Sequence, residues 1–167
     1  MMTLVDAIIE SWDRQARIVS SVASLVVSEN SEILVSPNGT SLHFHLAHIH
    51  KVRHYFLGNV APKSLGGMTD GFLDGWETPV ENLDEIKRLL DDSALAVKSF
   101  LKYSLSEGES NDGKVGWYDH PVMFLQHLMW HEGWHVGMIL LGLREAGLEP
   151  SEEWEEMKIW SQWRNEI

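Results

Sequence analysis

Four long stretches of this chain carry apolar residues at steps of three and four, and this periodicity restricts the fold more than any other feature. They cover residues 3–28, about 40–59, 82–105 and 119–146. Such steps place apolar side chains on one face of an α-helix. No alternation typical of a β-strand is found over any length. One long and two shorter connections join the stretches, which predicts an all-α four-helix bundle with a long crossover connection.

Turn and capping residues mark where these helices begin and end. Thr3 and Thr40 are predicted N-caps, and Asn82 opens a capping-box pattern. Pro121 falls in a first helical turn, where its missing N–H costs nothing, and Gly147 ends the last long helix. The expected boundaries therefore agree with those given by the apolar periodicity.

Three segments lie outside the four long helices. Residues 60–80 are rich in Gly, Pro and Asp without a period, and two interpretations stand side by side: a functional lid or interface element, or an ordinary ordered crossover. Residues 108–119 form a polar connection, and a short amphipathic helix follows Pro150 and carries Trp154, Trp160 and Trp163. At 167 residues, the chain is expected to fold as a single domain over 1–167.

Composition excludes several classes of protein. There is no cysteine, so disulfides and thiolate metal sites are excluded, and His and carboxylates remain as the strong ligands. The net charge of -12 argues against a nucleic-acid partner, because that affinity rests largely on Lys and Arg. No apolar run suits a signal peptide or a membrane span. We therefore expect a cytoplasmic protein with no membrane partner.

The fourth helical stretch contains His127, His131 and His135 at spacings of four. Residues four apart lie one above the other on a helix, so His131 and His135 can bind one metal ion together. The face centred between them is otherwise apolar and is predicted to point into the bundle. His127 lies to the side of that face. One shared metal ion explains two inward histidines better than two unrelated hydrogen-bond partners do.

The second helical stretch carries five histidines that fall into two groups. Helical geometry places His43, His50 and His54 on a polar side, which predicts a solvated or dimer-interface patch, with a pH-sensitive or metal-binding patch as the alternative. His45 and His48 lie within the apolar arc. Bundles build metal sites from facing helices, so either His45 or His48 can supply a third ligand, and periodicity slightly favours His45.

Residues 131–135 also match the H-E-x-x-H pattern of zinc proteases, in which the glutamate is the general base. That motif normally lies beside a sheet that binds extended peptide, and no sheet is predicted here. A protease is therefore the weaker hypothesis. Glu132 remains a tentative catalytic residue that could contact a metal-bound water, but it could equally face solvent or a neighbouring helix.

Residues 40–49 with His48, followed by residues 125–137 with H-x-x-x-H-x-G, resemble the DinB-like superfamily over nearly the whole chain. The resemblance implies a four-helix bundle with a three-histidine metal site formed by His48, His131 and His135, often with nickel or zinc. It overrides the preference for His45. The family often ends this motif with H-R-G-Q, whereas Val136 and Met138 stand here in place of the Arg and Gln, so any role of those polar residues in substrate binding is not carried over.

The resemblance implies several functions. Characterised relatives are thiol S-transferases that use bacillithiol, mycothiol or glutathione, a mycothiol-dependent isomerase, and metal-dependent hydrolases, and family members are frequently homodimers. We therefore expect a metal-dependent enzyme that activates a low-molecular-weight thiol or water against a small-molecule substrate. A non-catalytic metal-binding protein is the alternative.

Overall fold

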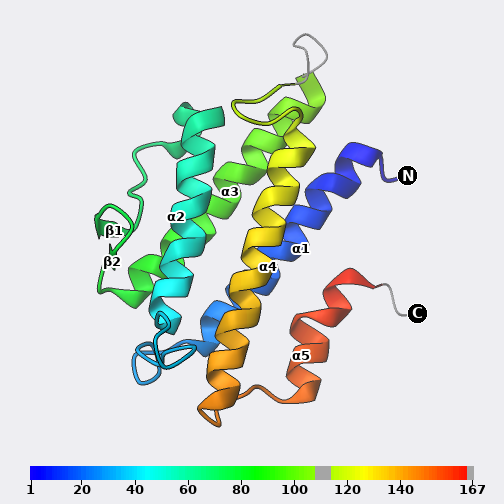
Figure 1. Ribbon diagram of the computed structural model, residues 1–167. Helices are drawn as coiled ribbons and strands as arrows, with labels where there is room; N and C mark the ends of the chain where they lie inside the picture. Colours follow the sequence, from blue (N-terminus) through cyan, green and yellow to red (C-terminus); the bar gives the residue numbers. More distant parts are fainter. Residues whose placement is uncertain (108–113, 165–167) are drawn as a thin grey trace.

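The computed structural model describes residues 1–107 and 114–164, and it confirms the predicted all-α bundle (Figure 1). Four long helices form the bundle, and the predicted short C-terminal helix follows them. The helices are α1 (Leu4–Leu25), α2 (Leu42–Val60), α3 (Leu83–Glu107), α4 (Pro121–Glu145) and α5 (Glu152–Lys158). Among the described residues, no helix is both long enough and apolar enough to cross a membrane.

The helices begin where side chains can satisfy their free backbone N–H groups. Thr3 and Asp6 form a reciprocal capping box at α1, as the sequence predicted for the cap. The predicted cap of α2 was wrong by one residue, because Ser41 Oγ accepts the N–H of Phe44 at 3.2 Å. Thr40 instead lies 3.0 Å from a ring nitrogen of His45.

At α3, Asn82 Oδ1 accepts the N–H of Glu85 at 3.1 Å. Pro121 opens α4 in the predicted first-turn position, and the preceding His120 accepts the N–H of Val122. Gly147 follows α4 with a left-handed φ of 70°, which a glycine adopts without strain. Of the connection predicted at 108–119, residues 108–113 lie outside the described part of the chain.

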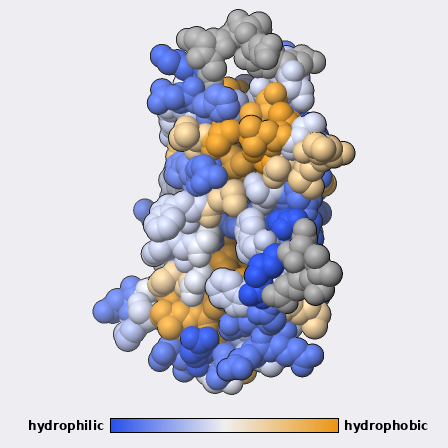
Figure 2. Space-filling model, turned by 90° about the vertical axis from the view of Figure 1, so that its right-hand side faces the viewer, coloured by the Kyte–Doolittle hydropathy of each residue, from blue (hydrophilic) through white to orange (hydrophobic). Residues whose placement is uncertain are grey.

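In the bundle, α1 and α2 each pack against both α3 and α4. The short helix α5 and the 3₁₀ turn Trp160–Trp163 fold back onto α1, where Arg14 donates to the carbonyl of Gln162 at 2.8 Å. The start of α1 and residues 152–163 therefore lie on one side of the molecule (Figure 1). Figure 2 shows that side, on which residues of mostly intermediate hydropathy lie between an upper apolar patch and a lower one.

One polar layer crosses the bundle and divides its apolar core into two clusters. Each of the four long helices supplies one buried residue to this layer: Gln15, Arg53, Ser93 and Glu132. On α1, for example, Trp12 belongs to one cluster and Ile18 to the other. Buried polar groups must be paired to avoid a desolvation penalty, so this layer fixes how the four helices align along their axes.

The crossover between α2 and α3 is an ordered segment that lies along α2 (Figure 1). It contains a 3₁₀ turn, Pro62–Leu65, and a small antiparallel hairpin of strands β1 (Phe72–Asp74) and β2 (Thr78–Pro79). No strand was predicted here, because elements of three and two residues are too short to show alternation. Of the two interpretations left open for residues 60–80, ordered packing on α2 is what the structure shows.

The predicted outward patch of three histidines on α2 was wrong, because the crossover covers it. His43, His50 and His54 each place Nε2 within 2.8–3.0 Å of a crossover carbonyl oxygen, belonging to Val80, Thr69 and Met68 respectively. His50 has no exposed surface. The polar face of α2 is therefore a docking face for its own crossover.

Candidate metal centre

The structure brings His48 of α2 together with His131 and His135 of α4. One ring nitrogen from each of the three lies within 4.8 Å of the others. The Nε2 atoms of His131 and His135 are 3.0 Å apart, and the ring of His48 is centred 4.9 Å from that of His135. These are the three residues that the family resemblance implied.

The surroundings of these histidines suit a divalent metal ion. Two imidazole nitrogens on one ion, each about 2.0–2.1 Å from it, lie roughly 3.0–3.4 Å apart, which includes the observed separation of the two Nε2 atoms. The Nδ1 atoms of His48 and His131 are buried and have no hydrogen-bond partner within the described residues. Buried nitrogens without partners are costly, so the protein alone does not satisfy His48 and His131, as expected of residues that bind a ligand.

Burial also keeps the three imidazoles in the neutral form that metals bind. Desolvation, followed by the charges of neighbouring histidines, lowers the pKa of His135 to about 2 and that of His131 to about 4. Desolvation lowers the pKa of His48 as well. Without a metal ion, all three rings are therefore neutral at pH 7, and each keeps one nitrogen lone pair that can bind a metal ion.

His45 has a different setting, although periodicity placed it slightly ahead of His48 as the third ligand. Its Nδ1 lies 2.7 Å from Nδ1 of His135, and its Nε2 lies 3.0 Å from Oγ1 of Thr40. Both of its nitrogens therefore already have a partner, one of them a candidate ligand. His45 therefore stands behind a candidate ligand, whereas His48 belongs to the cluster itself.

Glu132 faces the polar layer of the bundle and has no exposed surface. Its Oε1 accepts from Nε of Arg53 at 2.6 Å and its Oε2 from Nη2 of Arg53 at 2.9 Å. The amide of Gln15 approaches Oε2 at 3.3 Å. Both carboxylate oxygens are thus engaged, so this geometry does not support the tentative catalytic role of Glu132 or the general-base role that the zinc-protease hypothesis requires.

His127, which the sequence placed beside the ligand face, contacts the segment that precedes α4. Its Nδ1 lies 2.7 Å from the hydroxyl oxygen of Tyr118, and its ring packs edge-on against Phe56. Burial raises the pKa of Tyr118 to about 12, so the phenol is neutral at physiological pH. This pair borders the cluster one helical turn from His131.

Aromatic side chains surround the histidine cluster on its open side. Phe44 stacks on His48 with ring centroids 5.7 Å apart, and Trp76 approaches the same ring at 5.6 Å. Trp134 lies edge-on to His135 at 4.7 Å. Trp76 and Trp134 remain 40% and 54% exposed, so they form an aromatic rim that a bound molecule could contact.

Sequence reasoning did not assign Trp76 to the site, because Trp76 lies in the aperiodic crossover. The hairpin fold brings it to α2, where the ammonium group of Lys51 lies 5.1 Å from its ring centroid. Lys51 also pairs with Asp70 of the crossover. Only the aperiodic, Gly- and Pro-rich composition of residues 60–80 pointed to a functional role for this segment.

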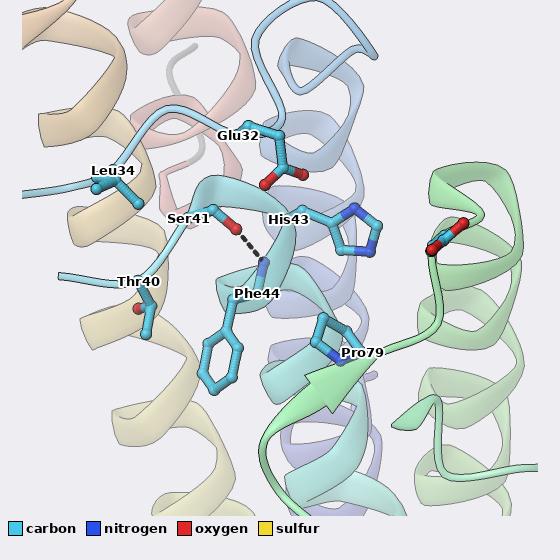
Figure 3. Close-up of a pocket in the computed structure, with 8 residues that line it drawn as sticks. Glu32, Leu34, Thr40, Ser41, His43, Phe44 and Pro79 are labelled. Atoms are coloured by element: carbon cyan, nitrogen blue, oxygen red, sulfur yellow. Dashed lines mark hydrogen bonds between the residues drawn. The ribbon is translucent and has the colours of Figure 1, made fainter. Parts of the chain in front are cut away.

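Next to the cluster, a cavity of about 360 Å³ lies between the start of α2, the segment before it, and the end of the crossover (Figure 3). Thr40 and Phe44 line it, and both also contact histidines of the site region. Glu32 and Glu81 give the opposite part of its wall an acidic character. The cavity thus adjoins the outer side of the histidine cluster through Thr40 and Phe44.

A family model described as the DinB family matches residues 1–165 of the chain. Searches of curated proteins and of solved structures gave no significant match.

Proposed function

Because the chain belongs to the DinB family, we propose that it is a metal-dependent enzyme in which His48, His131 and His135 hold the metal ion. The observation that carries this proposal is the composition of the cluster. It joins three neutral imidazoles, and no fourth His, Asp or Glu of the described residues belongs to it. Three protein ligands leave a coordination position open, which is typical of catalytic rather than structural sites.

A divalent ion bound there would lower the pKa of a coordinated thiol or water and so supply a nucleophile near neutral pH. Imidazole ligands suit both nickel and zinc, so the ligand set does not choose between them. A low-molecular-weight thiol in the open position would make the protein an S-transferase, and water would make it a hydrolase. The substrate in either case is a small molecule.

The protein's own residues prepare the site for this chemistry. The ion pair of Glu132 with Arg53 ties α4 to α2, and the two helices carry all three candidate ligands. Ligand spacing is thereby set by rigid helices, which hold geometry better than loops do. The aromatic rim of Trp76 and Trp134, together with Phe44, borders the cluster and offers apolar surface to a substrate.

Cobalt substitution tests the proposal and separates its two versions. The cobalt-loaded protein should show visible absorption bands, and bacillithiol, mycothiol or glutathione should be titrated into it. A thiol-dependent change in those bands supports the S-transferase version. If none of these thiols changes the spectrum, that version fails, and hydrolysis remains to be tested with activated esters and amides.

One observation favours a non-catalytic metal-binding protein as the second candidate. The carboxylate nearest in sequence to the ligands, Glu132, is sequestered by Arg53, which leaves no evident general base on that helix turn. The coordination sphere distinguishes the candidates. X-ray absorption of the zinc-loaded protein should show an exchangeable oxygen or sulfur ligand if the site is catalytic, and a fourth protein nitrogen or oxygen ligand would favour the non-catalytic function.

A further inference from the structure

We propose that His45 is a positioning residue of the metal centre: it holds His135 in the tautomer that presents Nε2 to the metal ion, and Thr40 in turn fixes the tautomer of His45. This inference rests on the proposed metal site and adds to it a chain of hydrogen bonds that leads from a ligand to the protein surface. The chain runs over two contacts, His135 to His45 at 2.7 Å and His45 to Thr40 at 3.0 Å.

The direction of each hydrogen bond follows from the position of His135. Its Nε2 faces His131 at 3.0 Å inside the cluster, so Nε2 is the nitrogen available to a metal ion. A ligating nitrogen must carry a lone pair rather than a proton, and a neutral imidazole has one proton to place. That proton therefore resides on Nδ1 of His135, and this N–H donates a hydrogen bond to Nδ1 of His45.

The same reasoning fixes His45. Because its Nδ1 accepts a hydrogen bond from His135, the neutral ring carries its proton on Nε2. This N–H donates a hydrogen bond to Oγ1 of Thr40. Each nitrogen in the chain then has one role and one partner. A change of tautomer in only one ring breaks the first contact, since two bare or two protonated Nδ1 atoms would repel each other at 2.7 Å. A change in both rings keeps the two hydrogen bonds, but it places the proton on Nε2 of His135 and so removes the lone pair that a metal ion needs.

Burial and packing make this contact a fixed part of the site. His45 is 3% exposed and its ring is centred 5.0 Å from that of His135. It lies one turn of α2 before His48, so the same helix supplies both a candidate ligand and the support for another. Thr40 is exposed and lines the cavity of Figure 3, so the chain of hydrogen bonds ends where solvent can enter.

The tautomers can be read directly on the unaltered protein. Long-range ¹H–¹⁵N correlation spectra of the zinc-loaded, ¹⁵N-histidine-labelled chain should show His135 protonated on Nδ1 and zinc-bound through Nε2. His45 should be protonated on Nε2, with a bare and metal-free Nδ1. A proton on Nδ1 of His45, or zinc bound to Nδ1 of His135, overturns the proposal.

Variants test the consequence for affinity. Substitution His45→Leu removes the acceptor and should weaken zinc binding about 10- to 100-fold in competition with a chelator, the range found when the partner of a ligating histidine is lost. His45→Asn should stay within about threefold of the wild type, because its Oδ1 can accept at the position of Nδ1. His54→Leu, on the same helix but bonded to Met68, is the matched control and should bind zinc normally.

Unchanged zinc affinity in His45→Leu would contradict the positioning role, and so would failure of Asn to restore affinity when Leu weakens it. The tautomer measurement requires no variant and therefore decides the matter even if His45→Leu does not fold. Failure of the wild-type protein to bind zinc or nickel would instead refute the proposed function itself. Because all readouts concern the metal and the histidine protons, they do not depend on the reaction.

Discussion

Arg53 and Glu132 form a two-pronged ion pair in the centre of the bundle, with side chains that are 1% and 0% exposed. The guanidinium also donates to the carbonyl of Leu90 at 2.8 Å and lies over the ring of Trp12. One contact set thus links all four long helices. It also gives the glutamate of the H-E-x-x-H pattern a structural role, because its carboxylate holds α4 against the neighbouring helices.

Breaking this ion pair should destabilise the protein strongly. Substitution Arg53→Met or Glu132→Gln leaves the partner charge buried and unpaired, which should lower the free energy of unfolding by about 3–5 kcal/mol in urea titrations. Replacing both residues by apolar ones should cost less than the sum of the single changes. Arg88→Met breaks the exposed pair with Asp92 on α3 and, as the control, should cost less than about 1 kcal/mol. If the buried and the exposed substitutions lowered the free energy of unfolding equally, the stabilising role of the Arg53–Glu132 pair would be refuted.

Metal content should depend on the three clustered histidines. Substitution of His48, His131 or His135 by Ala removes one of three ligands, so each variant should retain far less zinc or nickel than the wild type after gel filtration. Elemental analysis gives the stoichiometry. His43→Ala changes a histidine that bonds to the crossover carbonyl of Val80 and should retain the metal. Full metal content in the His48 and His131 variants would exclude this cluster as the site.

Acid should destabilise the metal-free protein well above the range in which carboxylates titrate. Burial lowers the pKa of His45, His50 and His131 to about 4, whereas unfolded histidines titrate near 6.5. Between these values the unfolded chain binds more protons, so stability falls as the pH falls from about 6.5 to about 4, and these groups contribute no change above that window. Urea titrations of the chelator-treated protein at several pH values measure this change in the free energy of unfolding.

The contribution of His50, which is not a candidate ligand, to this acid destabilisation can be measured on its own. His50 has no exposed surface, and its substitution by Leu removes one proton-uptake site from the unfolded chain. The slope of stability against pH within the window should then decrease by up to about 1.4 kcal/mol per pH unit. A metal-free protein whose stability does not change between pH 7 and 5 would contradict the lowered pKa values.

Two glycines of α4 should respond in opposite ways to the same substitution. A Cβ at Gly142 would lie 2.9 Å from Leu42 and 3.3 Å from Val35, so Gly142→Leu should overpack this contact and cost about 1–3 kcal/mol. Gly137 has open space around its Cβ position, so Gly137→Leu should stabilise the helix by several tenths of a kcal/mol. Thermal melts of the two variants make the comparison, and a neutral Gly142→Leu would show that α4 does not approach this segment closely.

The helices, most of their caps and the paired histidines of α4 follow from sequence alone. Apolar periodicity is a local property, since it arises from 3.6 residues per turn and needs no knowledge of the neighbours. The i, i+4 spacing of His131 and His135 likewise guarantees a shared helix face.

The remaining features of the site were decided by packing between helices. Periodicity gives the direction of a side chain only to within a few tens of degrees, so it could not separate His45, behind the ligands, from His48, among them. It also could not show that Arg53 reaches Glu132 from another helix. The covering of the α2 histidines and the placement of Trp76 depend on an aperiodic crossover whose position is set by long-range contacts. Local spacing thus determined which residues share a face, and the rotation and axial alignment of the four packed helices determined what each face meets.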